Sequence, residues 1–392
     1  MPGSSDPLGA PWLIVAAGFH FHGGMDKANA ELASYLLSKG AAVHLVAHDV
    51  DRRFLEHPRA TVHLVRRPLG SFALGEFGLD RRGRAVARRL RRAGRDVRVV
   101  VNGGNCRWDD INWVHYVHHA WTDVDPAAPL WFKLKHRLFS TRWRSSERRA
   151  LRASRIVIAN SRRTHTDLLA YVGVPADRVR TIYLGTDAGD GLASDVERSD
   201  ARRWLRLEAD RPAIAFVGAL GLDRRKGFDT LTKAWTRLCS TPGWDAVLIV
   251  AGSGADASSF SEHAAGDAIS DRIRFLGHTD RVRDVLAAVD LLVSPVRYEP
   301  YGLNVQEALC RGVPAIVSRT AGVAERYPDD LSDMLLDDPD NVDELVGVLR
   351  RWREHADEWK VRVAPFGNEL RAYGWQDMAR AFVETVSPGT AA

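Results

Sequence analysis

Short runs of aliphatic and β-branched residues alternate along the chain with stretches in which apolar residues recur at helical spacing. Runs of the first kind, bounded by Gly, Asp or Asn, are typical of buried parallel strands. They stand at 12–17, 43–47, 97–101, 111–117, 156–159, 180–184, 213–218, 247–251, 273–276, 291–294 and 315–318. Helical patterns follow many of them, for example at 26–38 and at 228–239. The alternation predicts an α/β fold with helices packed on parallel sheets.

A polar stretch rich in Gly, Asp and Ser divides this pattern into two halves. We expect a first domain over 1–187, a linker over 188–210 and a second domain over 211–373, each domain being large enough for its own core. The last helical pattern begins at 374 and is predicted as a separate C-terminal helix with a tail that ends at 392.

Composition predicts a cytoplasmic protein. Hydrophobic residues make up 45% of the chain and charged residues 27%, which is typical of a globular protein. The start has no basic segment followed by an apolar one, so no signal peptide is expected, and no apolar run is long enough to span a membrane. Cys106, Cys239 and Cys310 are odd in number and far apart, as reduced thiols are.

The segment 298–318 carries two carboxylates eight residues apart, Glu299 and Glu307, on either side of a loop that opens a helix. The helix is predicted to end at Arg311, because Gly312 suits a left-handed C-terminal position and a Val-Pro pair follows. Backbone N–H groups at a helix start favour phosphate. Carboxylates beside them can accept hydrogen bonds from sugar hydroxyls, so the combination suits a nucleotide sugar.

This segment, Glu-x7-Glu followed by Ala-Leu-x-x-Gly-Val-Pro, resembles the donor-site signature of the family-4 retaining glycosyltransferases. In that family the first Glu binds hydroxyls of the donor sugar and the second binds the ribose hydroxyls of the nucleotide. The resemblance therefore assigns the first role to Glu299 and the second to Glu307. It implies that the backbone between them holds the sugar and the diphosphate, at Tyr301, Gly302, Leu303 and Asn304.

The same resemblance implies the GT-B fold, in which two Rossmann-like domains face each other across a cleft. The acceptor would then bind mainly to the N-terminal domain, 1–187, and the nucleotide sugar to the C-terminal domain, 211–373. In this family the last helix crosses back to the N-terminal domain, which is the role implied for the helix in 374–392.

A second segment, 216–229, places Lys226 between a strand and a helix start, where a cation suits a diphosphate. The family pattern here is Val-Gly-Arg followed by Lys-Gly, and both cations neutralise the leaving diphosphate. This chain keeps Lys226 but has Ala219 in place of the arginine. Either Arg224 or Arg225 is expected to supply the second charge.

Glycines in both halves match the family's ligand-binding loops. Gly252 follows a strand that ends in small residues, a shape that lets a ligand approach the backbone. Gly277 lies in a segment that resembles the family loop holding the nucleotide base. Gly23 and Gly24 match a glycine pair whose backbone approaches the donor phosphate in the family.

Histidines at the end of the 111–117 strand are candidates for a donor-sugar contact. Relatives carry such a histidine after the preceding strand, where this chain has Asn and Gly only. We expect His118 to take over that contact, while His115 and His119 remain candidates and a structural role stays open. An acid pair at Asp123 and Asp125 could suggest a metal site, but it lies in a Pro-rich loop and GT-B enzymes need no metal. We therefore predict no metal and no cofactor.

Charge is distributed unevenly, with a net +10 in residues 1–200 and −5 in the remainder. Nine arginines lie between Asp80 and Arg98, in a pattern that predicts an amphipathic helix. The basic face from Arg81 to Arg98 could contact an anionic membrane, a polyanionic glycan or an acidic partner, or it could simply be solvated. No nucleic-acid-binding motif accompanies it, so nucleic acid is not expected as a partner.

Together these patterns predict a cytoplasmic, metal-independent retaining glycosyltransferase, which could also attach peripherally to the inner membrane face. It would move a hexose from a nucleoside diphosphate sugar to a hydroxyl of a glycan, a lipid-linked sugar or a small molecule. Two alternatives stay open. One is a GT-B nucleotide-sugar epimerase, which would need a different set of carboxylates and histidines. The other is an inactive, glycosyltransferase-like binding or scaffold subunit, which the Ala219 substitution favours.

Overall fold

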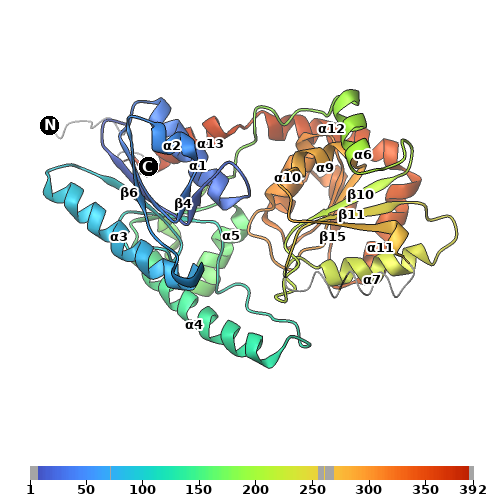
Figure 1. The fold of residues 1–392 in the computed structure, drawn as a ribbon, viewed down its shortest axis with the longest axis horizontal. Helices are drawn as coiled ribbons and strands as arrows, with labels where there is room; N and C mark the ends of the chain where they lie inside the picture. The colour runs from blue at the N-terminus through green and yellow to red at the C-terminus, as the bar shows by residue number, and fades with distance from the viewer. Residues whose placement is uncertain (1–7, 71, 255–259, 261–268, 388–392) are drawn as a thin grey trace. The chain divides into compact units, whose positions relative to one another are not determined.

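The fold comes from a computed structural model that describes residues 8–70, 72–254, 260 and 269–387. The first residues, on which the signal-peptide prediction rests, and the tail 388–392 lie outside the described residues. The chain forms two compact units. Unit 1 consists of 1–122, 130–185 and 374–392, and unit 2 of 123–129 and 186–373. Figure 1 shows the helices and strands of both.

Unit 1 is a parallel sheet covered by helices on both faces (Figure 1). Its described residues form seven strands in the order β5-β3-β1-β6-β7-β8-β9. Every residue of the central strands β1, β6, β7 and β8 is buried, as a sheet covered on both faces requires, whereas the edge strand β5 is partly exposed. The strands are β1 (Trp12–Val15), β3 (Val43–Ala47), β5 (Ala60–Leu64), β6 (Arg98–Asn102), β7 (Ile111–Val114), β8 (Ile156–Ala159) and β9 (Val179–Thr181), with a separate pair β2 (Gly18–Phe19) and β4 (Asp49–Val50). The helices are α1 (Met25–Ser38), α2 (Arg52–Glu56), α3 (Phe72–Arg92), α4 (Leu130–Ala153), α5 (Arg162–Asp167) and α13 (Trp375–Val386), with short turns η1 (Pro68–Gly70), η2 (Leu168–Val172) and η3 (Ala176–Arg178).

Unit 2 repeats this architecture with a smaller sheet. Its described residues form six parallel strands in the order β12-β11-β10-β13-β14-β15. The strands are β10 (Ala213–Val217), β11 (Val247–Ala251), β12 (Ile273–Gly277), β13 (Leu291–Ser294), β14 (Ala315–Ser318) and β15 (Leu335–Leu336). The helices are α6 (Asp195–Trp204), α7 (Phe228–Cys239), α9 (Val282–Ala288), α10 (Leu303–Cys310), α11 (Val342–Glu354) and α12 (Ala356–Arg371), with turns η4 (Ser270–Arg272), η5 (Gly322–Arg326) and η6 (Asp329–Met334).

The helix α13 packs in unit 1, although it is the last helix of the chain. Its buried face comprises Trp375, Met378, Ala379, Phe382, Val383 and Val386. The Phe382 ring lies 4.9 Å from that of Trp113 on β7, measured between ring centres. The expected crossing of the C-terminal helix to the N-terminal domain is therefore confirmed.

The stretch 188–210 differs from the linker that its polarity predicts, because it contains α6. A capping box starts this helix, since the Ser194 hydroxyl accepts from the Glu197 N–H while the Glu197 carboxylate accepts from the Ser194 N–H. Arg198 and Arg202 then attach it to unit 2, with bonds of 2.7 Å to the Asp290 carboxylate and to the Ala288 carbonyl oxygen. These residues belong to the core structure of unit 2.

The arginine-rich helix also differs in extent from its prediction. The helix α3 begins at Phe72 and ends at Arg92, so Arg95 and Arg98 lie outside it. Arg98 opens β6 and is buried, and its guanidinium donates to the Val386 carbonyl oxygen of α13 over 3.3 Å. Arg98 therefore cannot belong to an exposed basic face.

Candidate functional site

Lys226 and Glu299 are 73 residues apart in sequence and form an ion pair between Lys226 Nζ and Glu299 Oε2. Lys226 ends the loop after β10, and Glu299 lies in the loop after β13. Because β10 and β13 are neighbouring parallel strands, their carboxyl ends bring the two loops together. The side chains are mostly buried, with 18% and 15% of their surface exposed.

The Glu299 carboxyl is held in its ionised form by its cationic neighbours. Burial alone would raise its pKa, but the Lys226 ammonium and the Arg225 guanidinium outweigh that effect, so the pKa of Glu299 lies below its ordinary value. The site therefore presents an ionised carboxylate held against the Lys226 side chain.

Two helices begin directly beside this pair. Gly227 caps the start of α7 in a left-handed conformation, and Gly302 does the same for α10 with φ of 109°. A Cβ on Gly302 would lie only 2.9 Å from Val323 Cγ1, so the position requires glycine on both counts. The first N–H groups of two helices thus lie near one ammonium group, which is an arrangement that favours a diphosphate.

The loop that carries Glu299 is fastened to the following segment by its backbone. Gly322 N–H donates to the Glu299 carbonyl oxygen over 2.9 Å, and Val323 N–H donates to that of Tyr301 over 2.7 Å. The Tyr301 hydroxyl donates to the Gln306 side chain and accepts from Arg326, and burial raises the pKa of Tyr301 to about 12. Its ring is therefore part of the core, so that a ligand could meet the backbone of Tyr301 only.

The side chain of Asn304 also has a structural partner. Its amide nitrogen donates to the Val217 carbonyl oxygen over 3.0 Å, which attaches the first turn of α10 to the end of β10. Glu307 lies one turn further along α10 and is half-buried. Of the residues predicted between the two acids, Leu303 is half-buried at the helix start.

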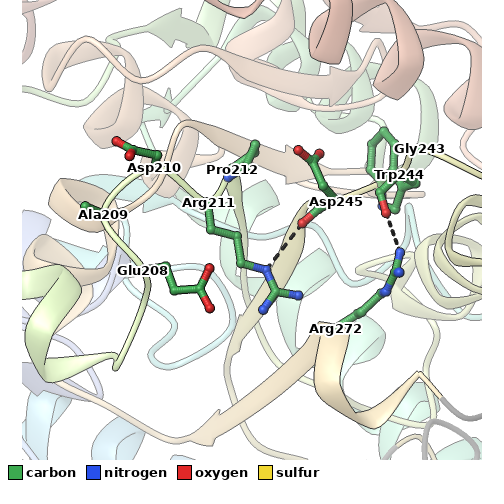
Figure 2. Close-up of a pocket in the computed structure, with 9 residues that line it drawn as sticks. All are labelled: Glu208, Ala209, Asp210, Arg211, Pro212, Gly243, Trp244, Asp245 and Arg272. Carbon is green, nitrogen blue, oxygen red and sulfur yellow. Dashed lines mark hydrogen bonds between the residues drawn. The ribbon is translucent and has the colours of Figure 1, made fainter.

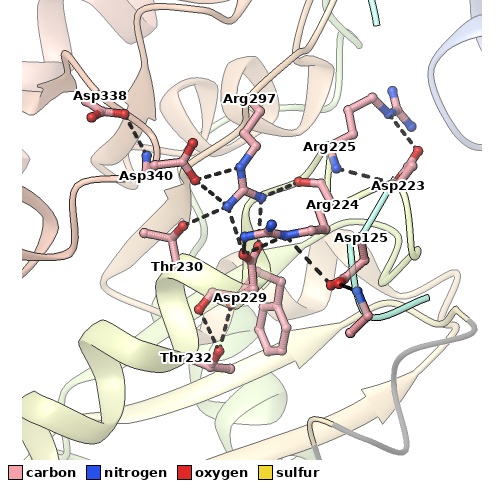
Figure 3. Close-up of polar contacts among 12 residues, drawn as sticks. Asp125, Asp223, Arg224, Arg225, Asp229, Thr230, Thr232, Arg297, Asp338 and Asp340 are labelled. Atoms are coloured by element: carbon pink, nitrogen blue, oxygen red, sulfur yellow. Dashed lines mark hydrogen bonds and ion pairs between the residues drawn. The ribbon is translucent and has the colours of Figure 1, made fainter. Parts of the chain in front are cut away.

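Arg224 and Arg225 lie in different environments (Figure 3). Arg224 donates to the Asp229 carboxylate, 3.0 Å from Nε, and lies 3.8 Å from that of Asp125. Arg225 has Asp223 at 3.6 Å and lies close enough to Glu299 to lower its pKa. Of the two arginines left open by the sequence, Arg225 is the one whose charge lowers the pKa of Glu299.

Arg297 organises this loop and was not singled out from the sequence. Its guanidinium donates to the Asp229 carboxylate over 2.7 and 2.8 Å, to Asp340, and to the Arg224 carbonyl oxygen (Figure 3). Its charged partners raise its pKa further, although burial opposes them. The sequence signal is its position directly before Tyr298 and Glu299, at the end of a buried strand.

Gly252 and Gly277 lie side by side after β11 and at the end of β12, where Gly252 N–H donates to the Gly277 carbonyl oxygen over 2.9 Å. A Cβ on Gly252 would fall 1.8 Å from the Gly218 carbonyl oxygen. Close packing of two backbone segments thus accounts for glycine at 252, whether or not a ligand is present.

Comparisons with known proteins bear directly on this site. Residues 211–355 match the sequence model of the glycosyl transferases group 1, and residues 22–190 match that of glycosyltransferase family 4. The first match contains Lys226, Glu299 and Glu307, and the second contains Gly23, Gly24 and His118. The chain belongs to the family 4 glycosyltransferases.

Two curated relatives of this glycosyltransferase share 30% identity with it. One is a lipopolysaccharide core biosynthesis mannosyltransferase, LpsB of Rhizobium meliloti, matched over 53% of this chain and 60% of the relative. The other is the 2-deoxystreptamine N-acetyl-D-glucosaminyltransferase of Streptomyces fradiae, matched over 49% and 45%. The chain thus spans about half the length of these curated relatives.

A solved structure shares the whole fold. Anabaena HepE, determined in complex with UDP-glucose, superposes on 96% of this chain and 99% of its own with a TM-score of 0.72, at 18% identity. The predicted GT-B fold of the glycosyltransferase is thereby confirmed.

In unit 1 of the glycosyltransferase, Gly23 and Gly24 precede α1, and Gly24 caps its start. Both are exposed, and nothing lies within 4 Å of a Cβ built on either one. Their backbone is therefore open to a ligand. His20, in the same loop, lies 3.4 Å from the Asp49 carboxylate.

The three candidate histidines after β7 differ in their surroundings. His119 Nδ1 lies 2.6 Å from the fully buried Glu147 carboxylate of α4, which also accepts from the His118 N–H over 2.9 Å. The His118 ring stacks on Trp143 with 5.4 Å between ring centres. Burial lowers the pKa of His115 to about 3, so that histidine is neutral. Glu147 thus fixes the backbone that presents His118 and was not predicted.

A cavity of about 700 Å³ in unit 2 lies away from these residues (Figure 2). Its lining comes from the segments that precede β10, β11 and β12, including Arg211, Asp245 and Arg272. Arg211 Nε donates to the Asp245 carbonyl oxygen over 3.3 Å. The cavity lies at the amino ends of the strands, whereas doubly wound sheets bind nucleotides at the carboxyl ends.

Proposed function

We propose that this glycosyltransferase moves a hexose from a nucleoside diphosphate sugar to an acceptor hydroxyl, with retention at the anomeric carbon and without a metal ion. The observation that carries the proposal is the Lys226–Glu299 ion pair between the starts of α7 and α10. It offers a cation for the diphosphate and a carboxylate for sugar hydroxyls within one small site.

In this mechanism Lys226 turns from Glu299 to the diphosphate, and the helix N–H groups share the charge. As the bond between the anomeric carbon and the phosphate oxygen breaks, the leaving group gains negative charge, which preorganised cations stabilise. Arg225 is the residue proposed to replace the cation missing at Ala219, because it already acts on the same carboxylate. Glu299, released from Lys226, accepts hydrogen bonds from the sugar.

Retention follows if the acceptor attacks on the face from which the diphosphate leaves. The acceptor oxygen then bonds to the anomeric carbon, and its proton passes to an oxygen of the leaving diphosphate. Glu299 orients the sugar in this proposal and does not attack the anomeric carbon, so no glycosidase-like carboxylate pair is invoked. Glu307 holds the ribose hydroxyls, while Gly23 and Gly24 offer backbone N–H groups to the phosphate.

The names of the relatives favour a hexose as the transferred sugar and are compatible with two classes of acceptor. The structure of HepE holds UDP-glucose, and the two curated relatives are named for a lipopolysaccharide core and for 2-deoxystreptamine. A reducing, cytoplasmic setting is supported by the three unpaired thiols, of which Cys106 and Cys310 are buried. Among helices formed by the described residues, none combines the length and hydropathy that a membrane crossing needs.

A binding subunit without catalysis is the second candidate, because Ala219 replaces a cation of the family pattern. The two are separated by offering the protein UDP-, GDP-, TDP- and ADP-hexoses in EDTA. Calorimetry would measure binding, and mass spectrometry would detect released nucleoside diphosphate. We expect one donor to bind and hydrolyse slowly, with an α-configured sugar giving an α-linked product by NMR once an acceptor is found. Binding without any turnover would favour the subunit, and absence of binding to all four would contradict both.

A further inference from the structure

The helix α4 in unit 1 exposes a row of large apolar side chains. Leu130, Trp131, Leu134 and Leu138 have exposed fractions of 83, 65, 71 and 68%. Their spacing places them on one face of the first helical turns. A single exposed leucine is ordinary, but a contiguous apolar row on the surface marks an interaction site.

The same face of α4 becomes basic towards the C-terminus. Its exposed charged residues are Lys135, Arg137, Arg142, Arg148, Arg149 and Arg152. The acidic residue of this helix, Glu147, is completely buried beneath His118 and His119. The exposed face of α4 is therefore apolar at one end, basic at the other and free of acidic groups.

The helix α3 repeats this order. Its exposed apolar residues, Leu74 and Phe77, are 48% and 65% exposed and lie in its first turns. Its exposed charged residues follow and are all arginines, Arg81, Arg82, Arg88, Arg89, Arg91 and Arg92, of which Arg91 pairs with Asp109. Its acids, Glu76 and Asp80, are half-buried, and Asp80 pairs with Arg84.

The two helices are neighbours on unit 1. Both connect strands of the same parallel sheet by crossovers of the same hand and direction, which places them on one face of it. Arg142 of α4 lies close enough to Glu76 of α3 to act on its carboxyl group electrostatically. In Figure 1 both helices, cyan and green, run along the same side of unit 1. We call their combined exposed residues the α3–α4 face.

We propose that the α3–α4 face docks unit 1 on an anionic lipid bilayer, and that the acceptor of the proposed sugar transfer is anchored in that bilayer. Leucine and tryptophan side chains would enter the boundary between headgroups and acyl chains, while the arginines bind the phosphates around them. The acceptor part of this inference rests on the proposed function, whereas the docking part does not.

The charge pattern favours a bilayer over other occupants of the face. A second copy would bring one set of arginines against another, which repel each other. A polyanionic glycan would satisfy the arginines but leave Trp131, Leu134 and Leu138 in water. An anionic bilayer meets both halves of the face at once, because its phosphates bind the basic residues and its acyl region takes up the apolar side chains.

Vesicle flotation with the full chain tests the docking. We expect binding to phosphatidylcholine vesicles that contain phosphatidylglycerol, little binding to phosphatidylcholine alone, and a loss of binding as salt is raised. Leu134→Ser should weaken binding at least tenfold, as should Arg148→Glu combined with Arg149→Glu. Val361→Ser serves as the matched control, because Val361 is 73% exposed on α12 in unit 2.

The outcomes separate the two proposals. Equal vesicle binding by Leu134→Ser and by the unchanged chain, or no binding to anionic vesicles at all, would overturn the docking. A dimer that Leu134→Ser converts to a monomer would assign the face to a second copy instead. Donor binding, measured by calorimetry, should be the same in Leu134→Ser and the unchanged chain. Its absence in both would contradict the proposed function and leave the docking result standing. A donor-competent enzyme that uses only water-soluble acceptors would overturn the acceptor part.

Discussion

Lys226 is paired with a carboxylate of its own chain, so a diphosphate that binds Lys226 competes with Glu299. The ion pair holds the ammonium group in place and keeps its side chain ordered in advance. A ligand must therefore offer more than one negative charge to displace Glu299, and a diphosphate flanked by two helix starts does so. Preorganisation of this kind lowers the reorganisation that the transition state requires.

Replacing Lys226 by alanine should lower turnover at least tenfold, because one preorganised cation at the leaving group is lost. The measurement is the rate of nucleoside diphosphate release from the donor at saturation. Lys233→Ala is the control, since Lys233 is exposed on the following helix, α7. Unchanged turnover in the Lys226 variant would mean that other groups hold the diphosphate.

Replacing Glu307 by alanine should weaken nucleotide binding about tenfold, because ribose hydroxyls lose a charged acceptor. Calorimetry with the nucleoside diphosphate alone measures this without the sugar. Glu354→Ala is a suitable control, because Glu354 is exposed at the end of α11. Equal affinities in both variants would remove the ribose role from Glu307.

At the residue scale, the sequence indicated Lys226 and Glu299 as site residues but not their contact. The contact depends on the order of strands in the sheet, with β13 next to β10, which local patterns do not contain. The choice between Arg224 and Arg225 was likewise open, because it depends on which of them meets Asp229. The hydrogen bond from Asn304 to the Val217 carbonyl oxygen also depends on how the chain folds and could not be predicted from local patterns.

At the scale of elements, most strands of the two sheets were predicted, whereas β5, β15 and several helices, among them α4 and α6, were not. Buried parallel strands are continuous apolar runs, so β10, β11, β13 and β14 could be located within a residue. The helix α4 was not predicted because its apolar residues do not form one stripe. Those of its first turns lie in solvent, whereas Leu151 near its end is buried. The helix α6 was not predicted because its sequence is polar, and the arginines Arg198 and Arg202 attach it to unit 2.

Glu76 makes the stability of the protein depend on pH. Burial raises the pKa of Glu76 from 4.5 to about 7, although Arg142 opposes the rise. The protonated carboxyl therefore fits the fold best, and this stability is fully present below pH 4.5 and is lost as pH rises through 7.

Glu76→Gln should accordingly stabilise the protein at pH 8, by about 2 kcal/mol after allowance for partial exposure, and have little effect near pH 5. Denaturant unfolding at the two pH values measures the difference. Glu354→Gln, at an exposed position, should change neither value. A gain of equal size at both pH values would show that the carboxyl group is not the cause.

At the scale of the whole molecule, the two units differ in how many separate segments of the chain form them. Unit 2 is nearly continuous from 186 to 373, whereas unit 1 needs the last helix, α13, to complete its core. The C-terminal helix was predicted from its apolar face, and its return to the first unit from the family resemblance. Its contact with Trp113 could come only from the structure.

Phe382→Ala should destabilise unit 1 by about 3 to 4 kcal/mol, the usual cost of deleting a fully buried ring. Hydrogen exchange followed by mass spectrometry can report the two units separately. Faster exchange should appear in β1, β6 and β7, while β10, β11 and β13 stay protected. Uniform loss of protection in both units would instead mean that they unfold as one.

The place of α13 also fixes the order in which the molecule can form during synthesis. The residues 186–373 leave the ribosome before Trp375–Val386, at roughly 10 to 40 s of elongation for that segment. Unit 1 begins first but cannot complete its core until Trp375–Val386 have been made, so the apolar surface under α13 stays uncovered until then. Unit 2, which begins later, can finish earlier. A chain cut short after residue 373 would therefore keep a complete second unit attached to an unfinished first one, a form that chaperones and proteases recognise by its uncovered apolar surface.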